Sequence, residues 1–278
     1  LAVGIELAIL VGLVIIGGIK SIGKVTEKLV PAMAAVYVIA CLIVIGTNIT
    51  NLPDAFGEII TGAFSPEGVT GGVVGVLIIG FQRAAFSNEA GVGSAPIAHS
   101  AVKTSRPASE GFVALLEPFI DTVIICTMTA LVIVIAEPQS WLDGKAAVAA
   151  GESPDPDGVV LTSDAFETVV PWFPYVLAIA VALFAFSTLI TWAYYTQKAW
   201  THLFGRSQFT ERLFQVIFCV FTVFGSVVTL SDVITLADSM LFLCALVNIF
   251  GLYLLLPVVR REVREYWADK KADRLVRA

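Results

Sequence analysis

Residues 80–100 read GFQRAAFSNEAGVGSAPIAHS, and this stretch decides how the rest of the chain is interpreted. It lies where a membrane-spanning helix is expected, yet it contains Arg83, the polar run 87–89 and the close pair Gly91 and Gly93. The hydrocarbon core of a bilayer penalises charge and unpaired backbone, so such a stretch survives only where it lines a protected, usually watery, cavity. A hydrophobic span interrupted by glycine and polar residues near its middle is typical of a transporter binding site.

The composition indicates an all-α, polytopic membrane protein. Hydrophobic residues make up 57% and charged residues 14% of the chain, whereas soluble domains carry about 25% charge. The four cysteines lie in apolar stretches without metal-ligand spacing, and two histidines are too few for a metal cluster. Leu1 lies inside an apolar run with neither an initiator methionine nor a charged leader, so we expect a fragment whose amino-terminal spans are missing.

Stretches of about 20 apolar residues are long enough to cross a bilayer as helices. The chain contains seven such candidates, at roughly 1–19, 29–48, 69–101, 110–136, 173–203, 212–230 and 232–258. The last two are expected to form a tight helical hairpin. The segments 49–68 and 137–172 are then extracellular, and the second is expected to be a partly helical cap, with a short helix within 164–170.

Lysines and arginines fix the orientation, because they are retained in cytoplasmic loops. Nearly all of the 17 basic residues lie in alternate loops, and the opposite loops are acidic. This pattern places the tail 259–278 in the cytoplasm of a multi-pass protein of the cell (inner) membrane. The tail alternates basic and acidic residues, so we expect a solvated helix whose basic excess rests on anionic lipid headgroups. No nucleic-acid partner is needed to explain it.

The third candidate span is expected to be a broken helix. Glycine permits non-helical dihedrals, and Pro96 suits the first turn of a helix. We therefore expect one helix to end near Phe86 and a second to start near Ser94. The first half-helix would offer carbonyls to a cation and the second would offer amides to a carboxylate, which together suit an amino-acid zwitterion. The alternative is a kinked structural helix.

Hydroxyl groups in the fifth candidate span could bind a small cation. Ser187, Thr188 and Thr191 lie in an apolar helix, and Trp192 follows Thr188 by four residues on the same face. Hydroxyl and carbonyl oxygens suit sodium. In membrane helices, however, serine and threonine usually bond the carbonyl one turn back, and this alternative stays open.

Intramembrane charges form a further set. Glu117 and Asp121 are four residues apart and therefore share one helix face. They either relay protons, face a vestibule or pair with neighbouring helices, and structural pairing is favoured over a proton relay, with Arg83 as one candidate partner. Glu89 is a second expected partner for Arg83.

Residues 83–104 (RAAFSNEAGVGSAPIAHSAVKT), followed by 119–134 (FIDTVIICTMTALVIV), resemble the signature region of the alanine/glycine:cation symporter family. Residues 11–40 resemble the pair of spans before that signature. The resemblance implies the leucine-transporter-like fold, with two inverted five-helix repeats whose first helices are broken. Residues 1–48 would then be the last two helices of the first repeat, and 69–258 the five helices of the second.

The resemblance also implies roles for particular residues. The substrate pocket would be lined by Phe86, Ser87, Asn88 and Gly91, and bordered by Trp192. A sodium site would use Ala185 through its carbonyl and Thr188 through its hydroxyl, with Ser187 beside them. The chain has Ala84 where the family commonly has glycine, and Val247-Asn248 where it commonly has Pro-Asn.

The resulting expectation is sodium-coupled import of alanine or glycine by alternating access, with sodium as coupling ion and no other cofactor. The choice between the two substrates and the oligomeric state stay open. A proton-coupled carrier would use Glu89, Glu117 or Asp121 instead. An intramembrane serine hydrolase built on Ser87 and His99 is disfavoured, because these residues are not expected to meet. A passive pore or scaffold is the remaining alternative.

Overall fold

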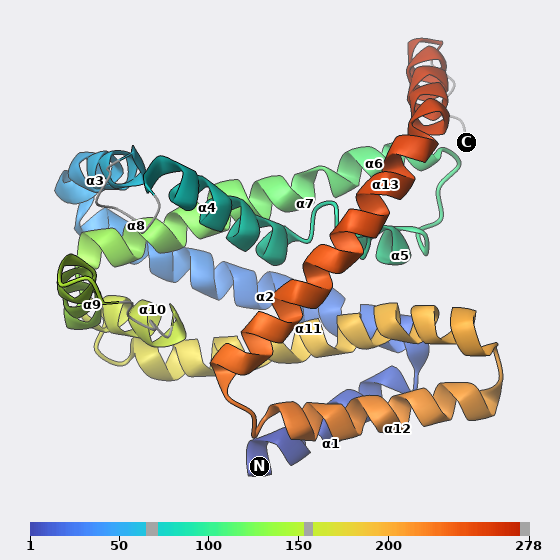
Figure 1. The fold of residues 1–278 in the computed structure, drawn as a ribbon, viewed down its shortest axis with the longest axis horizontal. Helices are drawn as coiled ribbons and strands as arrows, with labels where there is room; N and C mark the ends of the chain where they lie inside the picture. The colour runs from blue at the N-terminus through green and yellow to red at the C-terminus, as the bar shows by residue number, and fades with distance from the viewer. Residues whose placement is uncertain (65–71, 153–157, 273–278) are drawn as a thin grey trace. The chain divides into compact units, whose positions relative to one another are not determined.

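The computed structural model describes residues 1–64, 72–152 and 158–272, and these residues form helices joined by turns. No strand occurs among them, so the expected all-α class is confirmed. The helices are α1 (Ala2–Ile15), α2 (Gly18–Thr47), η1 (Ile49–Asn51), α3 (Leu52–Phe64), α4 (Gly72–Asn88), α5 (Ala95–His99), α6 (Pro107–Ala114), α7 (Leu116–Pro118), η2 (Phe119–Cys126), α8 (Thr127–Ala136), α9 (Gln139–Ala149), α10 (Gly158–Glu167), α11 (Phe173–Phe204), α12 (Gln208–Gly225) and α13 (Leu230–Lys271) (Figure 1).

Four helical stretches in the described part of the chain are long and apolar enough to cross a membrane. They are Gly18–Thr47, Pro107–Ala136, Phe173–Phe204 and Asp232–Lys271. The other expected spans correspond to α1 with 14 residues, the broken pair α4 and α5, and α12 with 18 residues. The start of the span expected at 69–101 lies outside the described residues. Seven spans therefore stay a prediction, whereas four are supported by helix length and composition.

The chain divides into two compact units. The first comprises Leu1–Ala8, Gln82–Val123 and Tyr195–Ala278, and the second comprises Ile9–Phe81 and Ile124–Tyr194.

The second unit has an apolar core in which α2, α8, α10 and α11 meet. Cys41, Val44, Val132 and Phe166 are completely buried there. Tyr37 of α2 reaches the same region, where its hydroxyl lies 2.6 Å from that of Thr129 in a hydrogen bond. Side chains that interlock in this way fix how these four segments pack.

The segment 137–172 is partly helical, as expected, and it belongs to this core. Its helices are α9 and α10, and the ring of Phe166 in α10 lies tilted against that of Phe173, with ring centroids 4.6 Å apart. The short helix expected within 164–170 begins earlier and ends at Glu167, so that boundary was wrong. The residues added at its start, 158–163, are exposed or half-buried, whereas Ala165 and Phe166 are buried against the core, so core packing does not set where this helix begins.

In the first unit, residues 226–229 join α12 to α13, which then diverges from α12 instead of folding back along it, so the expected tight hairpin is not formed (Figure 1). Ser207 caps α12 by accepting a hydrogen bond from the Thr210 amide at 3.1 Å. The last helix, α13, has 42 residues, and near its carboxyl end it packs against α6. Its residues 249–259 are apolar, and charged residues recur from Arg260 onward.

Candidate functional site

The expected helix break is present in the structure. Helix α4 ends at Asn88, two residues later than expected, and α5 begins at Ala95. Between them, Glu89, Gly91 and Gly93 have φ angles of 54°, 84° and 101°. Three left-handed residues within five positions cannot continue a right-handed helix. The unwound segment 89–94 is therefore a defined conformation of the backbone.

Local hydrogen bonds hold this unwound segment in place. The Asn88 side chain accepts a 2.9 Å hydrogen bond from the Ala90 amide, and the Val92 amide donates to the Glu89 carbonyl at 3.0 Å. The Ser94 hydroxyl donates to the Glu89 carboxylate. The Asn88 side chain thus satisfies the amide of Ala90, which lies just beyond the end of α4.

A side chain of the last helix, α13, contacts the unwound segment. Asn248 of α13 donates a 2.9 Å hydrogen bond to the Gly91 carbonyl. A Cβ atom on Gly93 would lie 3.0 Å from the Asn248 side-chain amide, a tight contact, and the φ angle of 101° at this position also favours glycine. Residue roles inferred from the signature region alone missed Asn248. A lone amide inside an apolar helix is the signal that identifies it.

The two polar side chains at the end of α4 face η2. The Ser87 hydroxyl donates to Asp121 at 2.6 Å, and the Asn88 amide donates to the Thr122 hydroxyl at 2.7 Å. η2 is π-helical, and such widened turns occur often at functional sites. The structure thus brings Ser87, Asn88 and Asp121 together beside the unwound segment.

The expected partners of Arg83 were wrong. Its guanidinium pairs with Asp238 of α13, and not with Glu89, Glu117 or Asp121. Gln82 also donates to Asp238, at 3.0 Å, so two consecutive residues of α4 hold one carboxylate. The Arg83 guanidinium also lies 5.6 Å from the centre of the Phe86 ring. The pairing follows from the approach of α13 to α4, which separation in sequence does not reveal.

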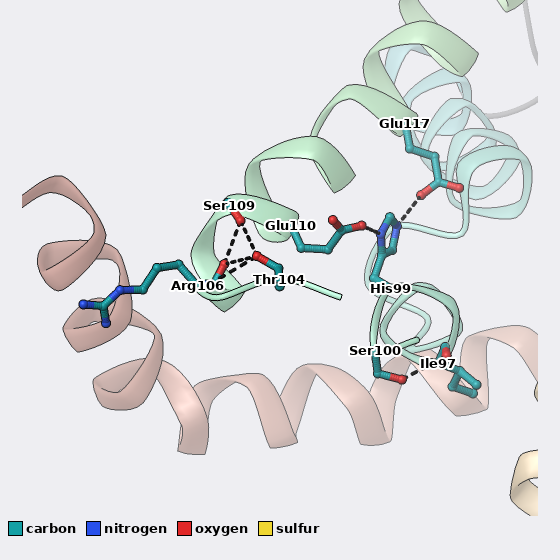
Figure 2. Close-up of polar contacts among 8 residues, drawn as sticks. All are labelled: Ile97, His99, Ser100, Thr104, Arg106, Ser109, Glu110 and Glu117. Atoms are coloured by element: carbon teal, nitrogen blue, oxygen red, sulfur yellow. Dashed lines mark hydrogen bonds and ion pairs between the residues drawn. The ribbon is translucent and has the colours of Figure 1, made fainter. Parts of the chain in front are cut away.

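Glu117 lies in a different cluster, which links α5 to α6 and α7. Figure 2 shows His99 between two carboxylates: its Nδ1 is 2.6 Å from Glu110 and its Nε2 is 3.6 Å from Glu117. The adjoining turn is closed by Thr104 and Ser109, whose hydroxyls are 2.8 Å apart and both bond to the Arg106 carbonyl (Figure 2). His99 and Ser87 therefore contact different carboxylates, which disfavours a serine–histidine pair.

The candidate cation ligands lie on α11, in the second unit. The Ser187 hydroxyl bonds the Phe184 carbonyl at 2.8 Å, and the Thr191 hydroxyl bonds the Ser187 carbonyl at 2.8 Å. Ser187 and Thr191 thus follow the bonding pattern usual for membrane helices. Ala185 and Thr188 are exposed on the helix, whereas Trp192 is half-buried. Their role beside the broken helix stays a prediction.

The comparison with protein families gives one match to nearly the whole chain. The model described as the sodium:alanine symporter family matches residues 1–277.

Individual relatives agree with this assignment. The chain is 37% identical over 274 residues to the sodium/alanine symporter AgcS of Methanococcus maripaludis, covering 98% of this chain and 58% of that protein. It is 33% identical to the probable sodium/glutamine symporter GlnT of Bacillus subtilis, and the match covers 99% of this chain and 55% of that protein. It is 29% identical to the sodium/proton-dependent alanine carrier protein of Bacillus sp. strain PS3, and the match covers 96% of this chain and 61% of that protein. The chain thus spans less than two thirds of the length of these relatives. It belongs to the sodium:alanine symporter family, a family of membrane transporters and not of enzymes.

Proposed function

We propose that the protein carries a small neutral amino acid, alanine or glycine, into the cell together with sodium. The observation that carries this proposal is the unwound segment 89–94, with Ser87 and Asn88 at its amino-terminal edge. An ordered non-helical backbone inside an apolar span is tolerated where it lines a binding cavity. Because the chain spans 58% of the length of its relative AgcS, the activity is proposed for the whole protein.

The proposed fold is leucine-transporter-like, with seven spans in this chain. Residues 1–48 complete the first inverted repeat and 69–258 form the second. The segments 49–68 and 137–172 are extracellular, and the tail 259–278 is cytoplasmic. In this arrangement α4 and α5 are the broken helix of the second repeat. Relative movement of the two repeats would expose the break to each side of the membrane in turn.

The substrate pocket is assigned to Phe86, Ser87, Asn88 and Gly91, with Trp192 limiting the size of the side chain. Ser87 and Asn88 are already paired with Asp121 and Thr122, so their donors and acceptors have fixed directions. Fixed polar groups reduce the entropy lost when a ligand binds. The pairing thus supports recognition of a small polar ligand.

Sodium is assigned to oxygen ligands on α11. The Ala185 carbonyl and the Thr188 hydroxyl are the proposed ligands, with Ser187 beside them. Co-binding of cation and substrate would favour the state in which the repeats can move, which couples the two fluxes. The names of AgcS and GlnT specify sodium for those relatives, and this supports the same ion here.

Proton coupling is the second candidate. The observation that favours it is the presence of three carboxylates near the break. Glu89 and Asp121 each accept a hydrogen bond from a serine hydroxyl, and Glu117 lies beside a histidine ring. One relative is named as sodium/proton-dependent. Carboxylates inside a membrane protein are frequent members of proton pathways.

Uptake of labelled alanine into vesicles containing the full-length protein separates these candidates. An inward sodium gradient at equal pH is compared with an inward proton gradient without sodium. The proposal expects accumulation with the sodium gradient and none with the proton gradient alone. Accumulation with protons alone would support the second candidate, and equal equilibration under every condition would indicate a passive pore.

A further inference from the structure

The carboxyl-terminal part of α13 extends beyond the membrane. The segment Asp232–Lys271 has 40 residues, which corresponds to about 60 Å of helix at 1.5 Å per residue. The hydrocarbon core of a bilayer is about 30 Å thick. The change from apolar to charged residues between Val259 and Arg260 therefore marks the level at which α13 leaves the hydrocarbon.

One face of this part of α13 contacts Arg106 and α6. Asp269, whose side chain is 13% exposed, pairs with Arg106, and Glu265 lies 3.4 Å from the same guanidinium. Phe112 of α6 lies against Tyr266, with ring centroids 5.4 Å apart. These contacts fix the rotation of α13 about its own axis, so the direction of its remaining side chains is fixed as well.

The opposite face carries exposed arginines. At about 100° per residue, Arg260 and Arg264 lie within about 40° of each other and on the far side of α13 from Asp269. Neither has an ion-pair partner among the residues that the structure describes. Arg261 has only long contacts within its own helix, 3.6 Å to Glu262 and 4.0 Å to Glu265.

These arginines line an open depression of about 400 Å³, which combines a cationic half with an apolar half. The lining residues are Tyr253, Leu256, Pro257, Arg260, Arg261 and Arg264. Pro257 lacks the amide hydrogen that would bond the Tyr253 carbonyl, so this carbonyl has no helical donor from residue 257. The apolar half faces the hydrocarbon side and the guanidinium groups lie at the headgroup level.

We infer that this depression binds an anionic phospholipid. Its phosphate contacts Arg260 and Arg264, whose positive charges attract an anionic headgroup at the membrane surface. The first carbons of an acyl chain lie along Tyr253 and Leu256. A soluble phosphate would leave this exposed apolar half unfilled, so the mixed character of the lining favours a lipid. The site is separate from the proposed transport pathway and does not depend on it.

The test is native mass spectrometry of the full-length protein released from nanodiscs with equal amounts of phosphatidylglycerol and phosphatidylcholine. Phosphatidylglycerol is expected to be retained preferentially. The triple variant R260Q/R261Q/R264Q should lower that preference by roughly tenfold to a hundredfold. R260K/R261K/R264K, which keeps the charges, should retain most of it. If the lysine variant lost as much lipid preference as the glutamine variant, positive charge would not explain the binding and the inference would be contradicted.

A matched control removes three other exposed basic residues. Lys20, Lys24 and Lys28 are spaced by four residues on α2, so K20Q/K24Q/K28Q changes the net charge equally. The lipid preference of this control should stay within about twofold of the unmodified protein. Equal losses in the two glutamine variants would show general charge attraction and contradict the inference. Displacement of phosphatidylglycerol by an equal concentration of glycerol phosphate would contradict a lipid ligand.

Discussion

Asn248 donates a 2.9 Å hydrogen bond to the Gly91 carbonyl, and this contact ties the last helix to the break in α4 and α5. The Gly91 carbonyl lies where the chain is unwound, so no helical amide is available to it. A side chain 157 positions away thus supplies a donor that the break requires.

Replacing Asn248 should loosen the break. Asn248→Ala removes the donor to Gly91, and leaving a partly buried carbonyl unpaired costs about 1–3 kcal/mol. We expect a lower unfolding temperature and weaker binding of alanine by roughly fivefold or more. Differential scanning fluorimetry and equilibrium binding measure these effects. Asn51→Ala, on exposed η1, is the matched control, and an equal effect in both variants would contradict the role given to Asn248.

Adding a methyl group to Gly93 should destabilise the protein for a different reason. In Gly93→Ala the new Cβ would lie 3.0 Å from Asn248, at a φ angle of 101° that alanine rarely adopts. Gly23→Ala is the contrasting change, because Gly23 lies inside α2 with open space around its Cβ position. Alanine is favoured over glycine in a helix by about 0.5–1 kcal/mol. The two variants should therefore shift the unfolding temperature in opposite directions, and a neutral Gly93→Ala would contradict the observed packing.

The ion pair between Arg83 and Asp238 should contribute more than an exposed pair. The Asp238 side chain is only 12% exposed, whereas that of Arg83 is 47% exposed. A double-mutant cycle with Arg83→Ala and Asp238→Ala is expected to give a coupling energy above about 1 kcal/mol, the upper end for surface pairs. Denaturant unfolding in detergent measures it. The same cycle on Lys145 and Glu58 is the control, and equal coupling energies would contradict the expectation.

The pair of Lys145 and Glu58 predicts a small effect at alkaline pH. The hydrogen bond that Lys145 donates to the Glu58 carboxylate raises the pKa of Lys145 above its ordinary value of 10.5. The folded state therefore binds this proton more tightly than the unfolded state does. The resulting stability is fully present below pH 10.5 and is lost as the pH rises through the higher folded pKa. Because both side chains are more than a third exposed, the contribution should stay below about 1 kcal/mol.

Unfolding temperatures of Lys145→Met and the unmodified protein, measured between pH 8 and about pH 12, check this effect. The difference between the two proteins should shrink as the pH rises. A constant difference would mean that the contact contributes through packing and not through charge.

The sequence predicted the local features of the site more fully than its long-range contacts. Glycines at 91 and 93 indicated the break, because their backbone freedom is a local property. The partner of Arg83 was predicted wrongly, because several carboxylates were available and only the packing of α13 against α4 selects Asp238. Asn248 and Glu110 were missed for the same reason: each meets its partner through the tertiary fold.

Equilibrium binding of labelled alanine to the full-length protein, with and without sodium, tests the central claim most directly. The unmodified protein and Asn51→Ala should bind alanine only when sodium is present. Asn88→Ala should lose this binding in sodium, because it removes the amide that joins the break to Thr122. Undiminished sodium-dependent binding by a folded Asn88→Ala variant would contradict the assignment of the substrate to the broken helix.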